Sequence, residues 1–440
     1  MTAAPSRGSQ TAALVGALGA AGVAEVDGRG VVAPRRRPFE VACWIGAEDG
    51  WRCGRDGEVP RQRRVGAYPV VETILRVPGG EAVQRVWGVG DGGGFIAVEV
   101  ENRSAAAFAV AFVLRPAGGK ECRTIDLRDE IVLVDGRPAI ALPRMPRAWA
   151  VARAGLGAMR SAVTGGETSE GAFRSYRDRR GVEAAFVFPV PHRTSVRAAV
   201  VLDAADTRSR IDPSTIPDAE AASRGWKAHL ERGTRTEMPD EALQLAVDAS
   251  RVSLLLEASA SRRPDATVVA GLEDWGFDAE AAIAWRRLGS RARRVASRRD
   301  RPATDPWRTV STYLAVASPA VTFPGGPAPF LRAVRDLIVC EVEGRVDLMP
   351  GFPPEWLGRD LAAHGVPTRG GTVSFAIRWH GERPALLWEA PAGTAITASR
   401  LDPGWSAPGP VGETLLARPP ASFDRSSHVQ ETSGAPEAPA

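Results

Sequence analysis

The stretch LMPGFPPEWLGRDLAAHGVPTRGGTVSFAIRWHGERPALLWEAP, residues 348–391, carries the clearest structural pattern of the chain. It begins with proline-rich turns at residues 350–354. Apolar side chains then stand at every second position: Val373, Phe375, Ile377 and Trp379. The turn at residues 381–384 leads into a second apolar run, 385–389. A period of two is that of a β-strand, so the segment predicts a hairpin whose apolar row, Trp379 included, faces a core.

The region upstream, residues 38–205, shows the same period of two over many short segments. The clearest are two neighbouring segments, with apolar residues at 96, 98 and 100 and again at 108, 110, 112 and 114. More strands are expected at 70–77, 130–134, 184–188 and 195–202, separated by breaks that contain glycine or proline. Many short strands at regular spacing predict a large antiparallel sandwich.

The apolar period changes to that of helices in the region 206–345. A linking helix is expected at 218–232. Pro239 opens a longer helix at a position where its missing N–H costs nothing, and Asp278 is expected to cap the next one. A last helix is predicted to end near Leu337. The fold class is therefore predicted to be α+β, with a large N-terminal antiparallel β-sandwich, a contracted helical domain and a small C-terminal β-sandwich.

This order of segments resembles that of the six-hairpin (α/α) toroid glycosidases, which include glucoamylase-like, glycogen-debranching and disaccharide-phosphorylase enzymes. The resemblance is carried by the last helix, by the turns Leu348-Met349-Pro350-Gly351 and Pro353-Pro354-Glu355-Trp356, and by the strands from Thr372 onward. It implies a β-supersandwich beside a ring of twelve helices. It also implies cleavage of α-glucosides by a carboxylate acid/base pair, with aromatic side chains that hold the sugar.

The helical segment of this chain is short for such a ring. Residues 211–345 number 135, whereas twelve helices with their connections would need about 200 residues. Four or five helices can be placed by periodicity, so the sequence predicts a partial toroid. The expected organisation is a helix/strand lead-in at 1–37, a β-supersandwich-like domain at 38–205, a linker helix and truncated helical domain at 206–345, a C-terminal β-domain at 346–418 and a disordered tail at 419–440.

Hydrolysis of a glycosidic bond needs two carboxyl groups that face the sugar, about 5–9.5 Å apart. The best candidates are Glu273 and Asp274, which stand beside Trp275 in the string LEDWGFD, residues 272–278. The same string also suits an ordinary connection between two helices, with its glycine making the turn and its last aspartate capping. Other carboxylates near the expected site are interpreted as exposed and structural: Glu341, Glu343 and Glu355.

Tryptophan is the outlier of the composition, with 12 residues against 3 tyrosines. Flat indole rings can stack on sugar rings, so Trp275, Trp356 and Trp307 are the candidate substrate-binding residues, with Trp149 as a further member. Large aromatic side chains also dominate the packing of any core. A purely structural role for each indole therefore stays open.

The composition argues against several other classes of protein. The formal charge of +4 comes from 56 basic and 52 acidic residues, so a nucleic-acid partner is not expected. The arginine-rich run 286–301 is expected to be a solvated helix end, and its role stays open. No glycine-rich nucleotide motif precedes a helix, and no histidine has the spacing of a metal ligand. We therefore expect no cofactor and no metal.

The location is predicted from cysteines and apolar runs. The four cysteines form no CxxC pair, which favours a reducing cytoplasm: Cys43, Cys53, Cys122 and Cys340. The weakly apolar run Ala12–Ala24 is expected to be a short packing helix, and a secretion signal is the alternative. No stretch reaches the roughly 20 apolar residues of a membrane span. A cytoplasmic protein without a membrane partner is expected.

Two functions follow as hypotheses. The first is carbohydrate-related binding or scaffolding by a protein that has lost catalysis, because no second carboxylate motif is visible in the shortened region. The alternative is a glycoside hydrolase or phosphorylase of α-glucosides, with a site completed by a partner subunit. A saccharide is the expected ligand, and a protein partner or a homo-oligomer is compatible with both hypotheses. Two exposed carboxylates facing one pocket would favour the enzyme.

Overall fold

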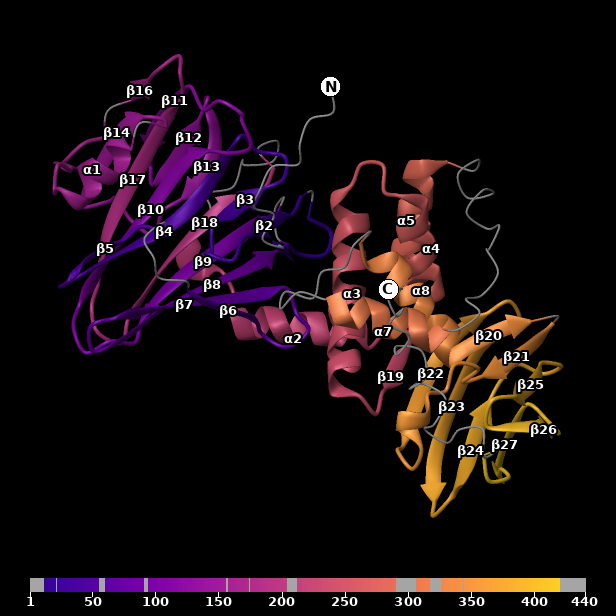
Figure 1. The fold of residues 1–440 in the computed structure, drawn as a ribbon. Coiled ribbons are helices and arrows are strands. Elements are labelled where there is room, and N and C mark those ends of the chain that lie inside the picture. Colours follow the sequence, from indigo (N-terminus) through magenta and orange to yellow (C-terminus); the bar gives the residue numbers. More distant parts are fainter. Residues whose placement is uncertain are drawn as a thin grey trace, which may run out of the picture.

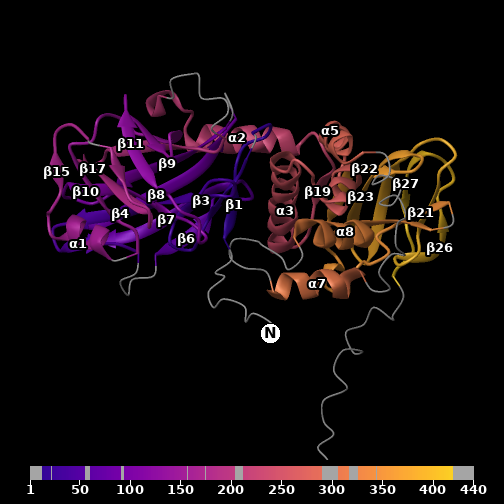
Figure 2. The same ribbon diagram turned by 90° about the horizontal axis from the view of Figure 1, so that it is seen from above.

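The computed structural model shows an α+β fold, as predicted. Strands from the N-terminal half build a large sandwich, helices follow, and two smaller sheets close the chain (Figure 1). The view from above in Figure 2 places the helices between the sandwich and the C-terminal sheets. The described residues are 12–20, 22–54, 60–90, 94–155, 157–173, 175–203, 212–289, 306–316, 326–342 and 344–419. The expected tail beyond residue 419 lies outside them.

The N-terminal sandwich consists of two nine-stranded antiparallel sheets in the described part of the chain. The first has the order β1-β2-β3-β4-β10-β17-β14-β15, with β5 on β4: β1 (Ala13–Val15), β2 (Ala24–Val26), β3 (Val32–Pro34), β4 (Phe39–Ala47), β5 (Gly50–Arg52), β10 (Phe108–Pro116), β14 (Ala148–Arg153), β15 (Ser169–Glu170) and β17 (Val182–Val190). The second has the order β16-β11-β12-β13-β18-β9-β8-β7-β6: β6 (Arg61–Arg64), β7 (Val70–Val77), β8 (Gly80–Val89), β9 (Phe95–Asn102), β11 (Thr124–Arg128), β12 (Ile131–Val134), β13 (Arg137–Ala141), β16 (Tyr176–Arg177) and β18 (Ser195–Val201). Alternate side chains of both sheets, such as Phe112, Phe186 and Ile140, fill one core between them.

The N-terminal lead-in belongs to the first sheet, and the expected helix at Ala12–Ala24 is wrong. β1 and β2 lie in this segment, pair with each other, and continue through β3 to β4. Glycines at positions 16, 19 and 22 recur through it, and glycine is a poor helix former. The backbone there also lies very close to β8, because a Cβ on Gly88 would come within 2.0 Å of the Gly16 carbonyl carbon. The sandwich therefore begins well before residue 38.

A row of alternating charges crosses five neighbouring strands on the outer face of the second sheet. Its members are direct cross-strand partners: Arg63, Glu72, Arg85, Glu99 and Arg197. The ion-pair distances along the row are 2.7, 3.1, 3.5 and 2.7 Å. The Arg197 guanidinium also lies 5.0 Å from the ring centre of Trp87, against which helix α2 (Ala219–Leu230) packs. Cross-strand ion pairs thus hold this face together beside α2.

Replacing Arg85 with methionine should lower the free energy of unfolding by about 2 kcal/mol. The Arg85 guanidinium contacts three carboxylates, those of Glu72, Glu99 and Glu101, at 3.1, 3.5 and 2.9 Å. Glu72 is only 3 % exposed, so it would lose a donor that water cannot fully replace. Urea titration measures the change. The control is Arg76→Met at an exposed position of β7, which should cost less than about 0.5 kcal/mol; equal costs would contradict this account.

Six helices of more than two turns lie in the described part of residues 211–345. They are α2, α3 (Glu241–Ala260), α4 (Ala266–Asp274), α5 (Asp278–Leu288), α7 (Pro306–Val316) and α8 (Pro327–Ile338). The described part thus holds one helix more than the four or five placed by periodicity. Asp218, Asp240 and Asp265 cap α2, α3 and α4 through their carboxylates. Asp278 was expected to cap α5, but it is the first residue of that helix. There the helix dipole stabilises its negative charge. The shorter α1 (Ala158–Thr164) lies in the sandwich.

Part of the arginine-rich run holds the end of α3 in place. Arg287 of α5 donates from Nη1 to the carbonyl oxygens of Ala258, Ser259 and Ser261, at 3.2, 3.2 and 3.1 Å. Arg36, which precedes β4, donates to the carbonyl oxygen of Ala260. Cations suit the last turn of a helix, where carbonyl groups lack intrahelical partners. The rest of the run, from residue 290 to 301, lies outside the described residues.

The helices share one core with the two C-terminal sheets, to which Leu254, Phe330 and Ile377 contribute. The first sheet has the order β19-β22-β23-β24-β27: β19 (Arg235–Glu237), β22 (Leu361–Thr368), β23 (Gly371–His380), β24 (Arg383–Glu389) and β27 (Val411–Leu415). The second has the order β20-β21-β25-β26: β20 (Val339–Val342), β21 (Arg345–Leu348), β25 (Ala395–Ala398) and β26 (Asp402–Ser406). β19 precedes α3 in the chain, so the expected boundary at residue 345 is not a break in the structure.

The hairpin that the sequence predicts at 371–389 is present as β23 and β24. Val373, Phe375 and Ile377 are buried, as their alternation predicts. Trp379 is only partly buried, because it stands one residue before the end of β23. Its ring packs on Phe352, with 6.3 Å between centroids, and the short helical turn η4 (Pro354–Trp356) follows that phenylalanine in the chain.

Candidate functional site

Glu273 lies in the last turn of α4 and is held by a neighbouring helix. Its Oε1 accepts a hydrogen bond from Trp285 Nε1 of α5 at 2.9 Å. The chain then turns at Gly276, whose φ of +75° favours glycine, and Phe277 N–H donates to Leu272 O at 2.9 Å. Residues 272–278 therefore form a connection between two helices, which was one of the two interpretations of this string.

Asp274 and Glu341 lie on either side of Arg335, a residue of α8 that is 4 % exposed. Arg335 Nε is 3.9 Å from Asp274 Oδ1, and Nη2 is 3.5 Å from Glu341 Oε2. Nη2 also donates to Pro367 O in β22 at 2.8 Å. The other Glu341 oxygen accepts from the backbone N–H of Arg369 at 2.8 Å. Asp274 and Glu341 thus share one buried arginine, whose guanidinium contacts both carboxylates.

Two of the candidate substrate-binding tryptophans, Trp275 and Trp356, lie in the core of the helical region. Trp275 and Trp356 are each 1 % exposed, so neither presents a ring face to a ligand. Trp275 Nε1 donates to Leu331 O of α8 at 3.2 Å. Trp307 is partly buried and packs edge-on against Trp356, at 5.4 Å and 66° between rings. Trp149 is 8 % exposed in the core of the sandwich. Packing, the alternative left open by the sequence, accounts for these indoles.

The remaining predicted carboxylates do not complete a pair opposite Glu273. Glu355 is exposed in the turn η4, as expected. Glu343 lies outside the described residues. Neither residue is thus placed opposite Glu273 by the described structure.

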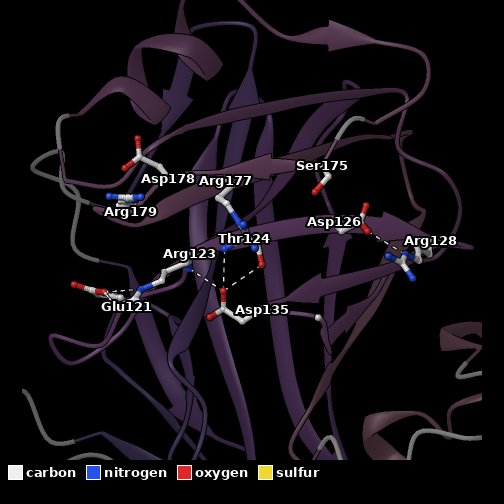
Figure 3. Close-up of a pocket in the computed structure, with 11 residues that line it drawn as sticks. Glu121, Arg123, Thr124, Asp126, Arg128, Asp135, Ser175, Arg177, Asp178 and Arg179 are labelled. Carbon is white, nitrogen blue, oxygen red and sulfur yellow. Dashed lines mark hydrogen bonds and ion pairs between the residues drawn. The ribbon is translucent and has the colours of Figure 1, made fainter.

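A pocket lined by charged and polar residues lies on the outer face of the second sandwich sheet, at its β16 edge (Figure 3). Its volume is about 990 Å³, at the upper end of the range for small-molecule sites. Four arginines and four carboxylates line it, together with Thr124, Ser175 and Gly136. Apart from Gly136, every lining residue carries a polar or charged group.

Strand alternation explains why polar side chains gather at this edge. In β11, Ile125 is buried in the sandwich core and Leu127 packs against it, so positions 124, 126 and 128 point outward. In β16, Tyr176 packs inward, and Arg177 is the cross-strand partner of Thr124. Figure 3 shows the Arg177 side chain pointing toward Thr124.

The carboxylates of the pocket are bound within the protein. Asp135 Oδ1 accepts from the backbone N–H groups of Arg123 and Thr124, at 3.0 and 2.9 Å. Asp178 Oδ1 accepts from the backbone N–H of Arg180 at 2.7 Å. The other two carboxylates pair with arginines: Glu121 with Arg123 and Asp126 with Arg128, both at 3.0 Å.

Arg177 and Arg179 differ from these two paired arginines. Both are exposed, and no carboxylate of the described residues forms an ion pair with either. Each guanidinium offers five N–H donors in a planar fork. The pocket thus presents unused donors beside carboxylate and hydroxyl acceptors, an arrangement able to bind a ligand with several oxygen atoms.

Other kinds of site find little support in the described residues. None of the four cysteines forms a disulfide, and burial raises the pKa of the Cys43 thiol to about 12, which disfavours the reactive thiolate. No three His, Cys, Asp or Glu side chains of this part gather closely enough to hold a metal ion. None of its helices is both long and apolar enough to cross a membrane.

Sequence reasoning missed the pocket because its residues come from separate segments, 121–128, 135–136 and 175–179. A weak signal was present in the alternation of charged and apolar residues over 123–128, which predicts a charged outer face but not a cavity. The chain matches no protein-family model, and a search of curated proteins gives no match either.

Proposed function

We propose that this chain is a carbohydrate-binding protein, related to the toroid glycosidases, that has lost catalysis. The observation that carries the proposal is the cluster of Asp274, Arg335 and Glu341. An acid/base pair needs an open gap between two carboxyl groups, whereas here a buried guanidinium contacts both Asp274 and Glu341. Glu273, the other candidate, is hydrogen-bonded to Trp285.

The β16-edge pocket is the proposed binding site for the saccharide. A sugar presents many hydroxyl groups, each of which can donate and accept hydrogen bonds. The pocket offers both kinds of partner, because arginine donors stand among carboxylates and the hydroxyls of Thr124 and Ser175. Its volume of about 990 Å³ leaves room for more than one sugar unit.

The alternative function is a hydrolase or phosphorylase of α-glucosides whose site a partner subunit completes. It requires the partner to supply a carboxylate opposite Glu273 and to open the space around Arg335. A cytoplasmic location belongs to the proposal in either case, because a chain with four cysteines and no disulfide fits a reducing compartment.

Two assays on the purified protein test the proposal. Maltose, trehalose, glycogen and aryl-glycosides should release no sugar above the buffer blank, because Trp285 binds Glu273 and Arg335 contacts both Asp274 and Glu341. Turnover that Glu273→Gln abolishes would replace the proposal by the enzyme alternative.

The second assay is binding to a microarray of neutral and acidic oligosaccharides. Ser175 is exposed and lines the pocket, so Ser175→Trp should place a bulky indole among the ligand-binding groups and abolish binding without disturbing the core. Thr372→Trp, at an exposed position of β23, is the control and should bind like the wild type. If the Ser175→Trp variant still binds, the saccharide site lies outside this pocket.

A further inference from the structure

We infer that the β16-edge pocket selects saccharides that carry an anionic group, a carboxylate or a phosphate, and that Arg177 and Arg179 hold this group. The inference rests on the proposed function and adds to it the charge of the ligand. It follows from which charged groups of the pocket already have partners within the protein and which do not.

The first step is the pairing of charges inside the pocket. Four arginines face four carboxylates, so the lining is neutral as a whole. Arg123 and Arg128 have carboxylate partners at 3.0 Å. Asp135 and Asp178 accept hydrogen bonds from backbone N–H groups instead. Backbone amides therefore satisfy two of the carboxylates, and the charges of two arginines stay available for a ligand.

The second step is the geometry of these two arginines. Arg177 ends β16 and Arg179 follows one residue later, so both come from one edge of the sheet. Arg177 points toward Thr124 in Figure 3, and Arg179 lies on the side of Glu121 and Arg123. A guanidinium binds a carboxylate or a phosphate through two parallel N–H···O bonds, which a neutral hydroxyl cannot match in strength. The anionic group of a ligand should therefore lie between β16 and the start of β11.

The third step limits the number of charges on the ligand. A polyanion such as a nucleic acid is attracted by a net positive surface, and the four carboxylates of this lining oppose such attraction. No aromatic side chain lines the pocket, so a nucleobase would find no stacking partner there. A sugar with a single acidic group fits both conditions, because its hydroxyls can use the carboxylates as acceptors.

Titration calorimetry of the full chain tests the inference with three matched sugars: glucose, glucuronate and glucose 6-phosphate. We expect at least one of the two acidic sugars to bind about tenfold or more tightly than glucose. Which of them binds more tightly distinguishes a carboxylate from a phosphate as the recognised group. Acetate and inorganic phosphate, titrated alone, should bind much more weakly than the sugars, because they lack the hydroxyls.

Variants connect this preference to the two arginines. Arg177→Gln and Arg179→Gln should each weaken binding of the preferred acidic sugar by about tenfold and leave glucose binding nearly unchanged. Arg76→Gln, at an exposed position on β7 near the other edge of the same sheet, is the control and should change neither.

The outcomes separate this inference from the proposed function. Glucose bound as tightly as both acidic sugars would overturn the inference and leave the proposed function intact. No binding of any sugar, here and on the oligosaccharide array, would overturn both. Inorganic phosphate bound as tightly as glucose 6-phosphate would show a plain anion site, which contradicts selection of a saccharide.

Discussion

Replacing Arg335 with alanine should lower the free energy of unfolding by about 3 kcal/mol. The change removes a guanidinium that contacts both Asp274 and Glu341, whose carboxylates stay partly buried at the junction of α4, α8 and β22. The hydrogen bond to Pro367 O is lost as well. We place the cost at the lower end for buried ion clusters because the contacts to the two carboxylates are 3.9 and 3.5 Å long. Urea titration followed by tryptophan fluorescence measures the change.

Two further variants show whether the cost comes from the cluster. Arg345 is exposed in β21, so Arg345→Ala should cost less than about 0.5 kcal/mol. Arg335→Met combined with Asp274→Asn and Glu341→Gln should recover part of the stability that Arg335→Met alone loses, because no charge is then left without a partner. If the triple variant is the least stable of all, the two carboxylates are held by something other than Arg335.

Replacing Trp356 with alanine should cost about 3–5 kcal/mol, a large share of the stability of a typical domain. Trp356 is 1 % exposed and packs edge-on against Phe352 and Trp307, at 6.2 and 5.4 Å between centroids. Its loss would leave a cavity at the turn η4, which connects β21 of one C-terminal sheet to β22 of the other. Thermal unfolding measures the change.

Trp379 is the matched comparison, because it packs against the same Phe352 from a partly exposed position. Trp379→Ala should therefore cost clearly less than Trp356→Ala. Equal losses of stability would show that the burial of the indole does not determine the cost of removing it. A normal stability of the Trp356→Ala variant, combined with weaker sugar binding, would restore Trp356 as a member of a sugar platform.

Much of the fold could be predicted from local periodicity. The alternation at 96–114 and 373–377 identifies strands because a buried sheet face repeats every two residues. The helices at 218–232 and 330–338 follow from the longer period. The N-terminal strands could not be predicted in this way, since β1 to β3 are three residues each and too short to show a period. Their state is decided by pairing with one another and, through β3, with β4, which only the tertiary structure supplies.

The site could be predicted far less well. The string at 272–278 fits both a catalytic loop and a helix connection, and only the positions of Trp285 and Arg335, 12 and 61 residues from Glu273 and Asp274, distinguish them. The residue type alone does not distinguish a tryptophan that binds a sugar from one that packs in a core. The burial of Trp275 could therefore be learned only from the structure. The pocket on the sandwich brings together three short segments whose proximity no local pattern encodes.

Binding without cleavage is the central claim, and one measurement tests it most directly. The purified protein is dialysed to equilibrium against a defined tetrasaccharide that contains glucuronate, in phosphate buffer so that phosphorolysis is possible, and mass spectrometry identifies the sugar on both sides of the membrane. We predict that intact tetrasaccharide accumulates on the protein side and that Ser175→Trp abolishes the excess. Shorter oligosaccharides or a sugar phosphate, formed by the wild type but not by Glu273→Gln, would contradict the account, and so would equal concentrations on the two sides.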